Sequence, residues 1–277
     1  MTLREALVVA TERLRAAGVV DPSRDARWLL AFAAGVPRDR LTLMAGDALA
    51  PEHAARFEAA LERRIARVPV SQIIGEKSFY GREFTVTPDV LTPRPETELL
   101  VELALAEPFE RVLDLGTGSG AILVTLLAER PDARGVGTDL SPQAVLVAGL
   151  NAARHGVASR ITLPISDWWD DVGSTYDLIV SNPPYIAARE MAGLMPEVRD
   201  HEPTMALTDD GDGLSAYRRI LAGAFDHLTR GGRLIVEIGH RQAREVVALF
   251  ESAGLTDVLV DTDLDGRNRV VRGRKPA

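Results

Sequence analysis

The chain has 277 residues, of which 46% are hydrophobic and 26% are charged, so it is long enough for one large domain or two smaller ones with real cores. It contains no cysteine, which excludes disulfides, thiolate metal sites and cysteine nucleophiles. The absence of cysteine is also consistent with a cytoplasmic location. Its five histidines are scattered without the spacing of ligands, so we expect no metal site. We also expect neither a signal peptide nor a membrane span, because no apolar stretch has the required length.

Charge is distributed unevenly along the chain. Residues 1–75 hold 11 arginines and 9 acidic side chains, a net charge of +2, whereas the whole chain has 32 basic and 40 acidic side chains. The remaining 202 residues therefore hold 21 basic and 31 acidic groups, a net charge of −10. Because phosphate neutralisation supplies most nucleic-acid affinity, this acidic part argues against a nucleic-acid partner.

The first 74 residues predict a small helical bundle. Apolar residues at helical spacing, bounded by proline and glycine, predict helices over 3–17, 22–35, 38–44 and 51–68. Asp21 before Pro22 predicts a helix cap, and Arg63, Arg64 and Arg67 predict a solvated helix face. The bundle is either a plain packed domain or a docking module for a macromolecular partner.

From Gly75 the hydrophobic period changes, and residues 75–91 predict a β-hairpin that links the helical domain, 1–74, to a catalytic domain, 92–277. In residues 92–277 predicted strands alternate with predicted helices, which indicates an α/β fold with a doubly wound sheet. The predicted strands lie at 112–115, 136–139, 161–165, 178–182, 234–238, 258–260 and 270–272.

Gly116, Gly118 and Gly120 follow a buried strand and lead into a helix. Glycines at such a turn let the backbone pass close to a ligand, and the helix N-terminus behind them favours negative charge. With Ala121 in the third place the loop also satisfies the dinucleotide fingerprint, and Asp139 lies near the distance expected for a ribose-binding acid. A nicotinamide enzyme is therefore one hypothesis.

Acidic residues near this loop favour S-adenosylmethionine instead. Asp114, two residues before the first glycine, is placed to bind an ammonium group rather than to face a second phosphate. Asp139 would then bind the ribose hydroxyls of an adenosine, and Asp167 with Trp168 would contact the edge and face of the adenine. Helix capping is the alternative role for Asp139 and Asp167.

The segment Ser181-Asn182-Pro183-Pro184-Tyr185 follows an apolar strand. Because two prolines cannot donate ladder hydrogen bonds, the strand ends there and Asn182 lies at its carboxyl end. The Asn182 side-chain oxygen and the Pro183 carbonyl would accept both hydrogens of a planar NH2 group, while the Tyr185 ring packs on its flat face. A proline-rich turn with an Asn cap is the alternative. We expect this motif and the glycine loop to flank one crevice, where the strand order reverses.

With these motifs assembled, the chain resembles the protein-(glutamine-N5) methyltransferases of the HemK/PrmC family, which modify the Gly-Gly-Gln motif of class I peptide chain release factors. The resemblance covers nearly the whole chain and rests on Thr92-Pro93-Arg94-Pro95-Glu96-Thr97-Glu98, Asp114-Leu115-Gly116-Thr117-Gly118-Ser119-Gly120, Ser166-Asp167-Trp168, Ser181-Asn182-Pro183-Pro184-Tyr185, Glu202-Pro203 and Asp263-Leu264-x-Gly266-x-x-Arg269. One departure is Asp200-His201 before Glu202, where an aromatic residue is common.

The resemblance implies a class I S-adenosylmethionine-dependent methyltransferase fold, with a seven-stranded doubly wound sheet whose last strand is antiparallel and a small N-terminal helical bundle. It implies a cytoplasmic monomer that acts on release factors and binds neither nucleic acid nor membrane. With the residue-level reasoning above, the expected cofactor-binding residues are Asp114, Gly116, Thr117, Gly118, Ser119, Gly120, Asp139, Asp167, Trp168 and Asn182. The expected catalytic residues are Asn182, Pro183 and Tyr185, and the expected substrate-binding residues are Asn182, Pro183, Pro184 and Tyr185.

Two further hypotheses stay open. The first is an adenine-N6 DNA methyltransferase, because Asn-Pro-Pro-Tyr alone also occurs in those enzymes; the net charge of −10 on residues 76–277 argues against it. The second is a non-catalytic interaction protein that binds the cofactor. For an amide substrate, nothing in the motif is basic enough to deprotonate the poorly nucleophilic nitrogen. Catalysis would therefore have to come from placement and from acceptors at the nitrogen.

Overall fold

The computed structural model describes residues 1–277 and divides the chain into two compact units. One comprises Met1–Glu76 with Met195–His201, and the other comprises Lys77–Leu194 with Glu202–Ala277. The hairpin predicted as a link therefore packs with the second unit, where Phe79 and Phe84 enter the core. No helix of either unit is both long and apolar enough to cross a bilayer, and no group of three or more His, Asp or Glu side chains is placed to hold a metal ion.

The first unit is a helical bundle, as the apolar periodicity predicts. Its helices are α1 Leu3–Ala16, α2 Pro22–Ala34, α3 Pro51–Ile65, α4 Val70–Ile74 and α8 Pro196–Arg199, and a 3₁₀ turn, Arg40–Thr42, occupies the predicted short helix. Leucines from different helices, such as Leu14, Leu29 and Leu61, fill its core. The predicted cap at Asp21 is wrong in one respect, because its side chain makes no capping bond and instead pairs with Arg24 at 3.1 Å.

The prediction of a solvated arginine face is wrong for Arg64 and Arg67. Arg64 Nε lies 2.8 Å from Asp25 Oδ2, and its Nη2 lies 2.8 Å from Glu197 Oε1, with all three side chains almost fully buried. Arg67 Nη2 pairs with the other oxygen of Glu197 at 2.7 Å. Arg63 and Arg64 lie in α3, whereas Arg67 lies beyond its end with a φ of +69°. The partners of Arg64 and Arg67 include residues of distant segments, which the local pattern does not reveal.

The second unit is built on a seven-stranded sheet with the order β5-β4-β3-β6-β7-β9-β8. Its strands are β3 Arg111–Leu115, β4 Arg134–Thr138, β5 Ile161–Thr162, β6 Tyr176–Ser181, β7 Leu228–Glu237, β8 Thr256–Thr262 and β9 Asn268–Arg274. The first five pair in parallel and β9 runs antiparallel to β7 and β8, which confirms the predicted sheet. The predicted strand 161–165 is shorter, with only an isolated bridge between Asp139 and Ile165 beyond β5.

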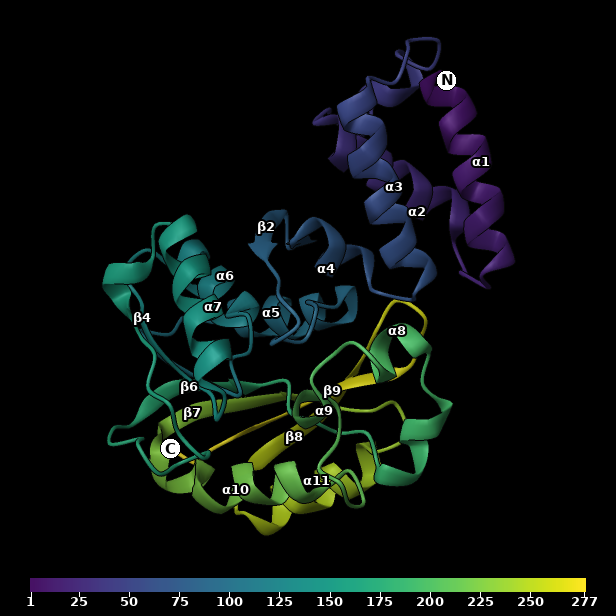
Figure 1. The fold of residues 1–277 in the computed structure, drawn as a ribbon. Helices are drawn as coiled ribbons and strands as arrows, with labels where there is room; N and C mark the ends of the chain where they lie inside the picture. Colours follow the sequence, from purple (N-terminus) through teal and green to yellow (C-terminus); the bar gives the residue numbers. More distant parts are fainter. The chain divides into compact units, whose positions relative to one another are not determined.

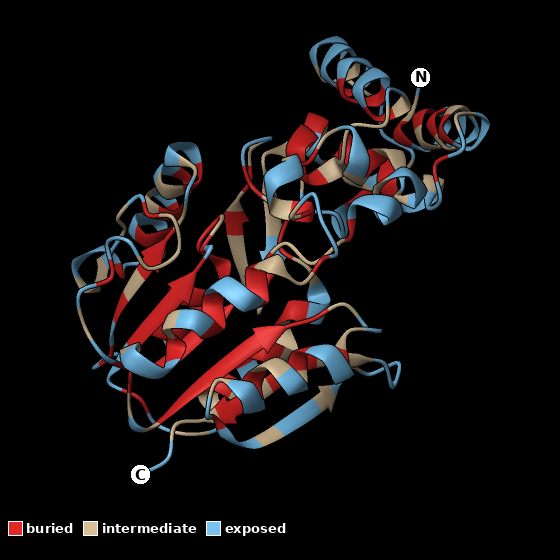
Figure 2. Cartoon of the chain, turned by 90° about the horizontal axis from the view of Figure 1, so that it is seen from below, coloured by how far each residue is buried: buried red, intermediate tan, exposed pale blue.

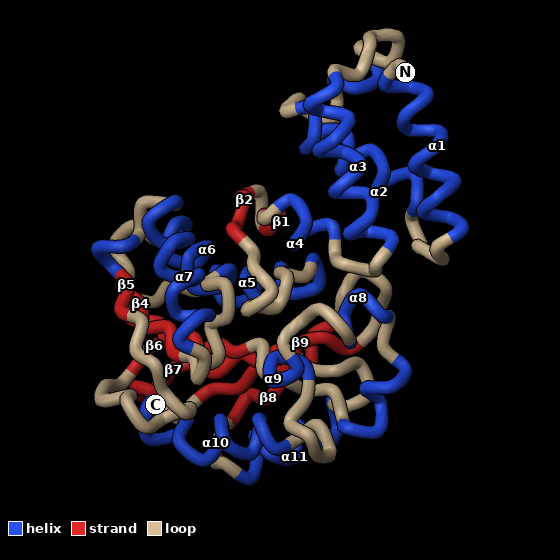
Figure 3. Tube along the Cα trace, in the orientation of Figure 1, coloured by secondary structure: helices blue, strands red, loops and turns tan.

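Helices cover both faces of this sheet (Figures 1 and 3). On one face lie α5 Glu98–Leu105, α6 Ala121–Glu129 and α7 Pro142–Arg154, and on the other lie α10 Ser215–His227 and α11 Ala243–Ser252. The remaining elements are β1 Glu76–Phe79, β2 Arg82–Thr85, α9 Thr204–Leu207 and the 3₁₀ turns Pro95–Thr97, Ala158–Arg160 and Ala188–Gly193.

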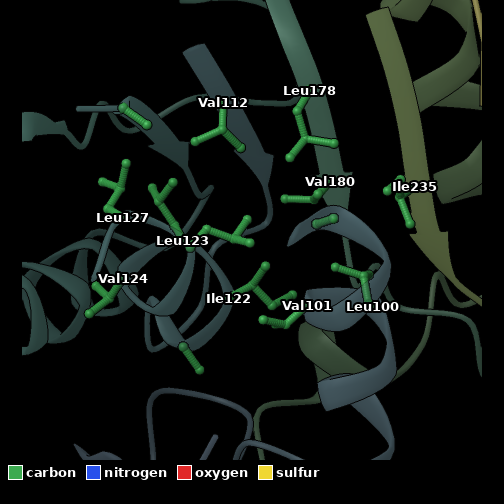
Figure 4. Packing of buried hydrophobic residues seen from close by; sticks show 14 of the residues in the cluster. Leu100, Val101, Val112, Ile122, Leu123, Val124, Leu127, Leu178, Val180 and Ile235 are labelled. Carbon is green, nitrogen blue, oxygen red and sulfur yellow. The ribbon is translucent and has the colours of Figure 1, made fainter. Parts of the chain in front are cut away.

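The central strands are buried on both faces, which explains their continuous apolar runs (Figure 2). In β6, Leu178 and Val180 join the core cluster under α5 and α6, whereas Ile179 joins the cluster under α10 and α11. Figure 4 shows the first cluster, in which helix residues Leu100, Val101, Ile122 and Leu123 gather against strand residues Val112, Leu178 and Val180.

Strand order and register place the two sequence motifs at one edge. β3 pairs with β4 on one side and with β6 on the other, so the order reverses at β3. Asp114 of β3 is level with Val180 of β6, and Ser181 Oγ donates a hydrogen bond of 2.7 Å to the Leu115 carbonyl. The glycine loop and Asn182 therefore leave the sheet at the same carboxyl edge, where ligands of such folds bind.

Candidate functional site

A cavity of about 410 Å³ opens at this edge of the sheet in the second unit. This volume lies in the range of small-molecule and cofactor sites. Of the residues that the sequence predicted, it is lined by Gly116, Thr117, Gly118, Ser119, Asp139, Asp167, Trp168, Asn182 and Pro184. Asp114, Gly120, Pro183 and Tyr185 are not among its lining residues.

The glycine loop forms one wall of the cavity. Gly116 and Gly118 have φ values of +72° and +54°, a region in which side-chain-bearing residues are strained. A Cβ atom built on either residue would meet no protein atom within 4 Å, so the space beside the backbone is open. The loop can therefore bring its peptide groups close to a bound molecule.

Asp114 lies behind this loop and is completely buried. Its Oδ2 accepts a hydrogen bond of 2.8 Å from Thr117 Oγ1, whereas Oδ1 has no hydrogen-bond partner. Burial raises the pKa of Asp114 to about 7, and the nearby Asp139 carboxylate adds to the rise. Although it does not line the cavity, the carboxylate places a negative charge behind Thr117, which would attract a cationic group of a bound ligand across the loop.

Asp139 joins the loop to the start of α7. Its Oδ2 accepts a 2.9 Å hydrogen bond from the Gly118 N–H, and its Oδ1 accepts one of 2.9 Å from the Ser141 N–H. Ser141 itself caps α7 by accepting from the Ala144 N–H. Burial raises the pKa of Asp139, while the backbone donors oppose the rise. Each carboxylate oxygen keeps further acceptor capacity, so the loop-bracing role and the binding of hydroxyl groups are compatible.

Asp167 and Trp168 form another part of the lining. Asp167 does not cap a helix through its side chain, since its carboxylate pairs with Arg219 of α10 at 2.9 Å and is half exposed. Trp168 is partly buried and has a φ of +56°, an unusual conformation for a tryptophan. A strained aromatic residue beside an acid at a cavity wall suits contact with a flat heterocycle.

Asn182 lines the cavity from the end of β6. Its Nδ2 donates a hydrogen bond of 3.2 Å to Thr97 Oγ1, so its Oδ1 is not used by that contact. The Tyr185 ring packs in the core cluster under α10 and α11, and its OH donates to Glu237 Oε1 at 3.3 Å. Burial raises the pKa of Tyr185 far above its usual value, so the phenol stays protonated.

Sequence reasoning missed the polar residues that lie around Asn182. Glu237, at the end of β7, is fully buried, and Thr97 bridges it to Asn182. Arg94 lines the cavity and pairs with the buried Glu202. An acidic residue inside the apolar run 234–238 was the available signal, because glutamate is rarely buried without a partner.

The arrangement offers two chemically different halves at one crevice. The glycine loop, Asp139 and Trp168 provide backbone groups, a carboxylate and an aromatic surface, which suit a nucleoside with a charged tail. Asn182 provides an amide that can accept hydrogen bonds from an NH2 group.

Two family models and several known proteins match this chain. The model of the PrmC N-terminal domain matches residues 5–75, and that of the methyltransferase small domain matches residues 95–198. A protein of Cereibacter sphaeroides named release factor glutamine methyltransferase is 60% identical over 100% of both chains. One of the same name from Caulobacter vibrioides is 45% identical over 99% of this chain and 97% of its own.

A solved structure has a similar fold. The crystal structure of a methyltransferase from Pyrococcus furiosus covers 78% of this chain and 100% of its own length, with a TM-score of 0.58 and 19% sequence identity. At this level of identity the similarity concerns the fold alone.

Proposed function

Because the chain belongs to the family of release factor glutamine methyltransferases, we propose that it transfers a methyl group from S-adenosylmethionine to the side-chain amide nitrogen of the Gly-Gly-Gln glutamine in class I peptide chain release factors. The observation that carries this proposal is that one cavity is lined by Asn182, whose side chain can accept hydrogen bonds, and by the glycine loop and Asp139. The proposal includes a cytoplasmic location, where release factors act.

The residues present fit S-adenosylmethionine. Asp139 would hold the ribose hydroxyls, Trp168 and Asp167 the adenine, and the Gly116–Gly118 backbone would lie along the amino-acid part. Asp114 lies behind the loop and does not line the cavity, so its carboxylate would attract the ammonium group across the loop and not by direct contact. When bound, the sulfonium supplies an electrophilic methyl group.

The residues around Asn182 would act on the glutamine by placement. Asn182 Oδ1 and the Pro183 carbonyl would each accept one hydrogen of its NH2 group, which aims the nitrogen lone pair at the methyl carbon. Positive charge grows on nitrogen as the new bond forms, and these oxygens oppose it. The methylated nitrogen is then acidic enough to release its proton to water, so no basic side chain is required.

The helical unit is proposed to dock the release factor. It carries exposed apolar side chains, among them Val8, Val20 and Leu43, which are exposed by 54%, 73% and 84%. A folded protein substrate needs contacts beyond one glutamine, because a small pocket provides little area. Of the two roles considered for the helical bundle, we therefore propose the docking module and not the plain packed domain.

The proposed function is tested by measuring which of four possible acceptors receives a labelled methyl group. Purified protein and S-adenosylmethionine labelled in the methyl group are incubated with a release factor, with its Gln→Ala variant in Gly-Gly-Gln, with a Gly-Gly-Gln peptide and with duplex DNA. We expect label in the release factor, a higher KM for the peptide, and none in the other two samples. Labelled DNA or a labelled alanine variant would contradict the proposed substrate.

Asp114 predicts a pH dependence of cofactor binding. Its pKa of about 7 means that the carboxylate is neutral below that pH and charged above it. Because only the charged form attracts an ammonium group, we expect the Kd for S-adenosylmethionine to rise roughly five- to tenfold from pH 7.5 to pH 6. Calorimetric titration measures this, and Asp114→Asn should bind weakly with a flatter profile. A wild-type profile that is flat would exclude this attraction.

A further inference from the structure

A buried chain of hydrogen bonds leads from the core to Asn182. Thr97 Oγ1 donates to Glu237 Oε2 at 2.6 Å and accepts from Asn182 Nδ2 at 3.2 Å. Thr97 and Glu237 are 4% and 1% exposed, so water does not compete for these bonds. Neighbouring strands bring the ends together, since Ser181 of β6 is level with Val236 of β7.

Glu237, at the buried end of these hydrogen bonds, accepts from its neighbours. The two Glu237 oxygens receive hydrogen bonds from two hydroxyls, Thr97 at Oε2 and Tyr185 at Oε1. Burial raises the pKa of Glu237, and the Thr97 hydroxyl and the Arg269 guanidinium oppose the rise. Thr97 Oγ1 is the donor to Glu237 Oε2, so its single hydroxyl hydrogen is committed to Glu237.

That commitment fixes the amide of Asn182. With its hydrogen used, Thr97 can only accept from Asn182, which therefore turns its NH2 group toward Thr97. The Oδ1 atom then points away from Thr97, at the opposite edge of the planar amide, where it can accept from a ligand. Rotation of the amide by 180° would set Oδ1 against the Thr97 oxygen, an acceptor against an acceptor.

We propose that Thr97, held by Glu237, is a positioning residue that keeps the acceptor oxygen of Asn182 facing the substrate and thereby makes the site select glutamine over glutamate. This inference rests on the proposed function. An NH2 group donates to Oδ1, whereas a glutamate carboxylate meets the same oxygen as a second acceptor. Selectivity of this kind comes from leaving buried polar groups unpaired with the wrong substrate.

The test compares Thr97→Val, which keeps the shape and removes the hydroxyl, with Thr97→Ser, which keeps the hydroxyl. Thr125→Val is the matched control, because Thr125 is also fully buried and its hydroxyl has no partner. For each variant, kcat and KM are measured with the release factor. Inhibition is measured with a release factor that carries Gly-Gly-Glu, which reports how strongly glutamate is rejected.

We expect Thr97→Val to lower kcat about tenfold to a hundredfold with little change in the Kd for S-adenosylmethionine. Its amide is free to rotate, so the Gly-Gly-Glu protein should inhibit this variant more strongly than the wild type. Thr97→Ser and Thr125→Val should keep wild-type values in both measurements. A looser fold alone would not improve binding of the glutamate form.

Wild-type turnover and wild-type rejection of Gly-Gly-Glu in Thr97→Val would overturn the inference. So would an equal loss in Thr97→Ser, because that variant keeps the hydroxyl. Failure of the proposed function is seen separately, as a wild-type protein that transfers no methyl group to the glutamine.

Discussion

Replacing Asn182 with alanine is expected to lower turnover about 10²- to 10³-fold while changing the Kd for S-adenosylmethionine less than about threefold. The magnitude follows from removal of one preorganised hydrogen-bonding group that acts on charge developing in the transition state. Asn182 lies at the end of β6, where its amide is held by Thr97, so the loss falls on placement of the target nitrogen. Single-turnover methyl transfer and calorimetric cofactor titration measure the two quantities separately.

Asn268→Ala is the control for this substitution, because Asn268 lies at the start of β9 and does not line the cavity. It should keep both turnover and cofactor affinity. Equal losses of turnover and affinity in Asn182→Ala would assign Asn182 to cofactor binding and would remove its proposed part in the chemistry.

Replacing Arg64 with methionine is expected to destabilise the helical unit by about 3–5 kcal/mol. Methionine fills similar space but leaves the buried Asp25 without the guanidinium that lies 2.8 Å away, whereas Glu197 keeps its pair with Arg67. An uncompensated buried charge costs much more than an exposed ion pair contributes. Hydrogen exchange of the α2 and α3 amides reports the stability of this unit without interference from the other.

Arg63→Met provides the matched control, since the neighbouring Arg63 is exposed and makes one hydrogen bond of 3.3 Å to the Gln72 carbonyl. We expect it to change exchange by no more than about 1 kcal/mol. If both arginine variants exchange alike, the buried cluster contributes no net stability.

Much of the fold was predictable because local pattern and global structure agree. The apolar runs of β3 and β6 are buried on both faces, and Gly116 and Ser141 lie where a strand must turn into a helix. Arg64 was not predictable, because a helical pattern shows which residues share a face but not what packs on it. Its partners lie 39 and 133 residues away along the chain.

The sheet edge at which the predicted site residues lie was predictable from the sequence, but the depth of each residue was not. Asn182 and the glycine loop are in the cavity wall, as the position of the strand ends requires. Asp114, by contrast, lies behind the loop, because the turn after β3 folds Thr117 back over it. The link from Thr97 to Glu237 joins residues 140 positions apart, and only the three-dimensional arrangement brings them together.

A crystal structure of the protein with S-adenosylhomocysteine and a release factor that carries Gly-Gly-Gln tests the role of Asn182 most directly. We expect the glutamine nitrogen to lie within about 3 Å of both Asn182 Oδ1 and the Pro183 carbonyl oxygen. Its open face should point toward the cofactor sulfur. A glutamine that meets Asn182 through Nδ2, or a basic side chain within hydrogen-bond distance of the target nitrogen, would contradict catalysis by placement.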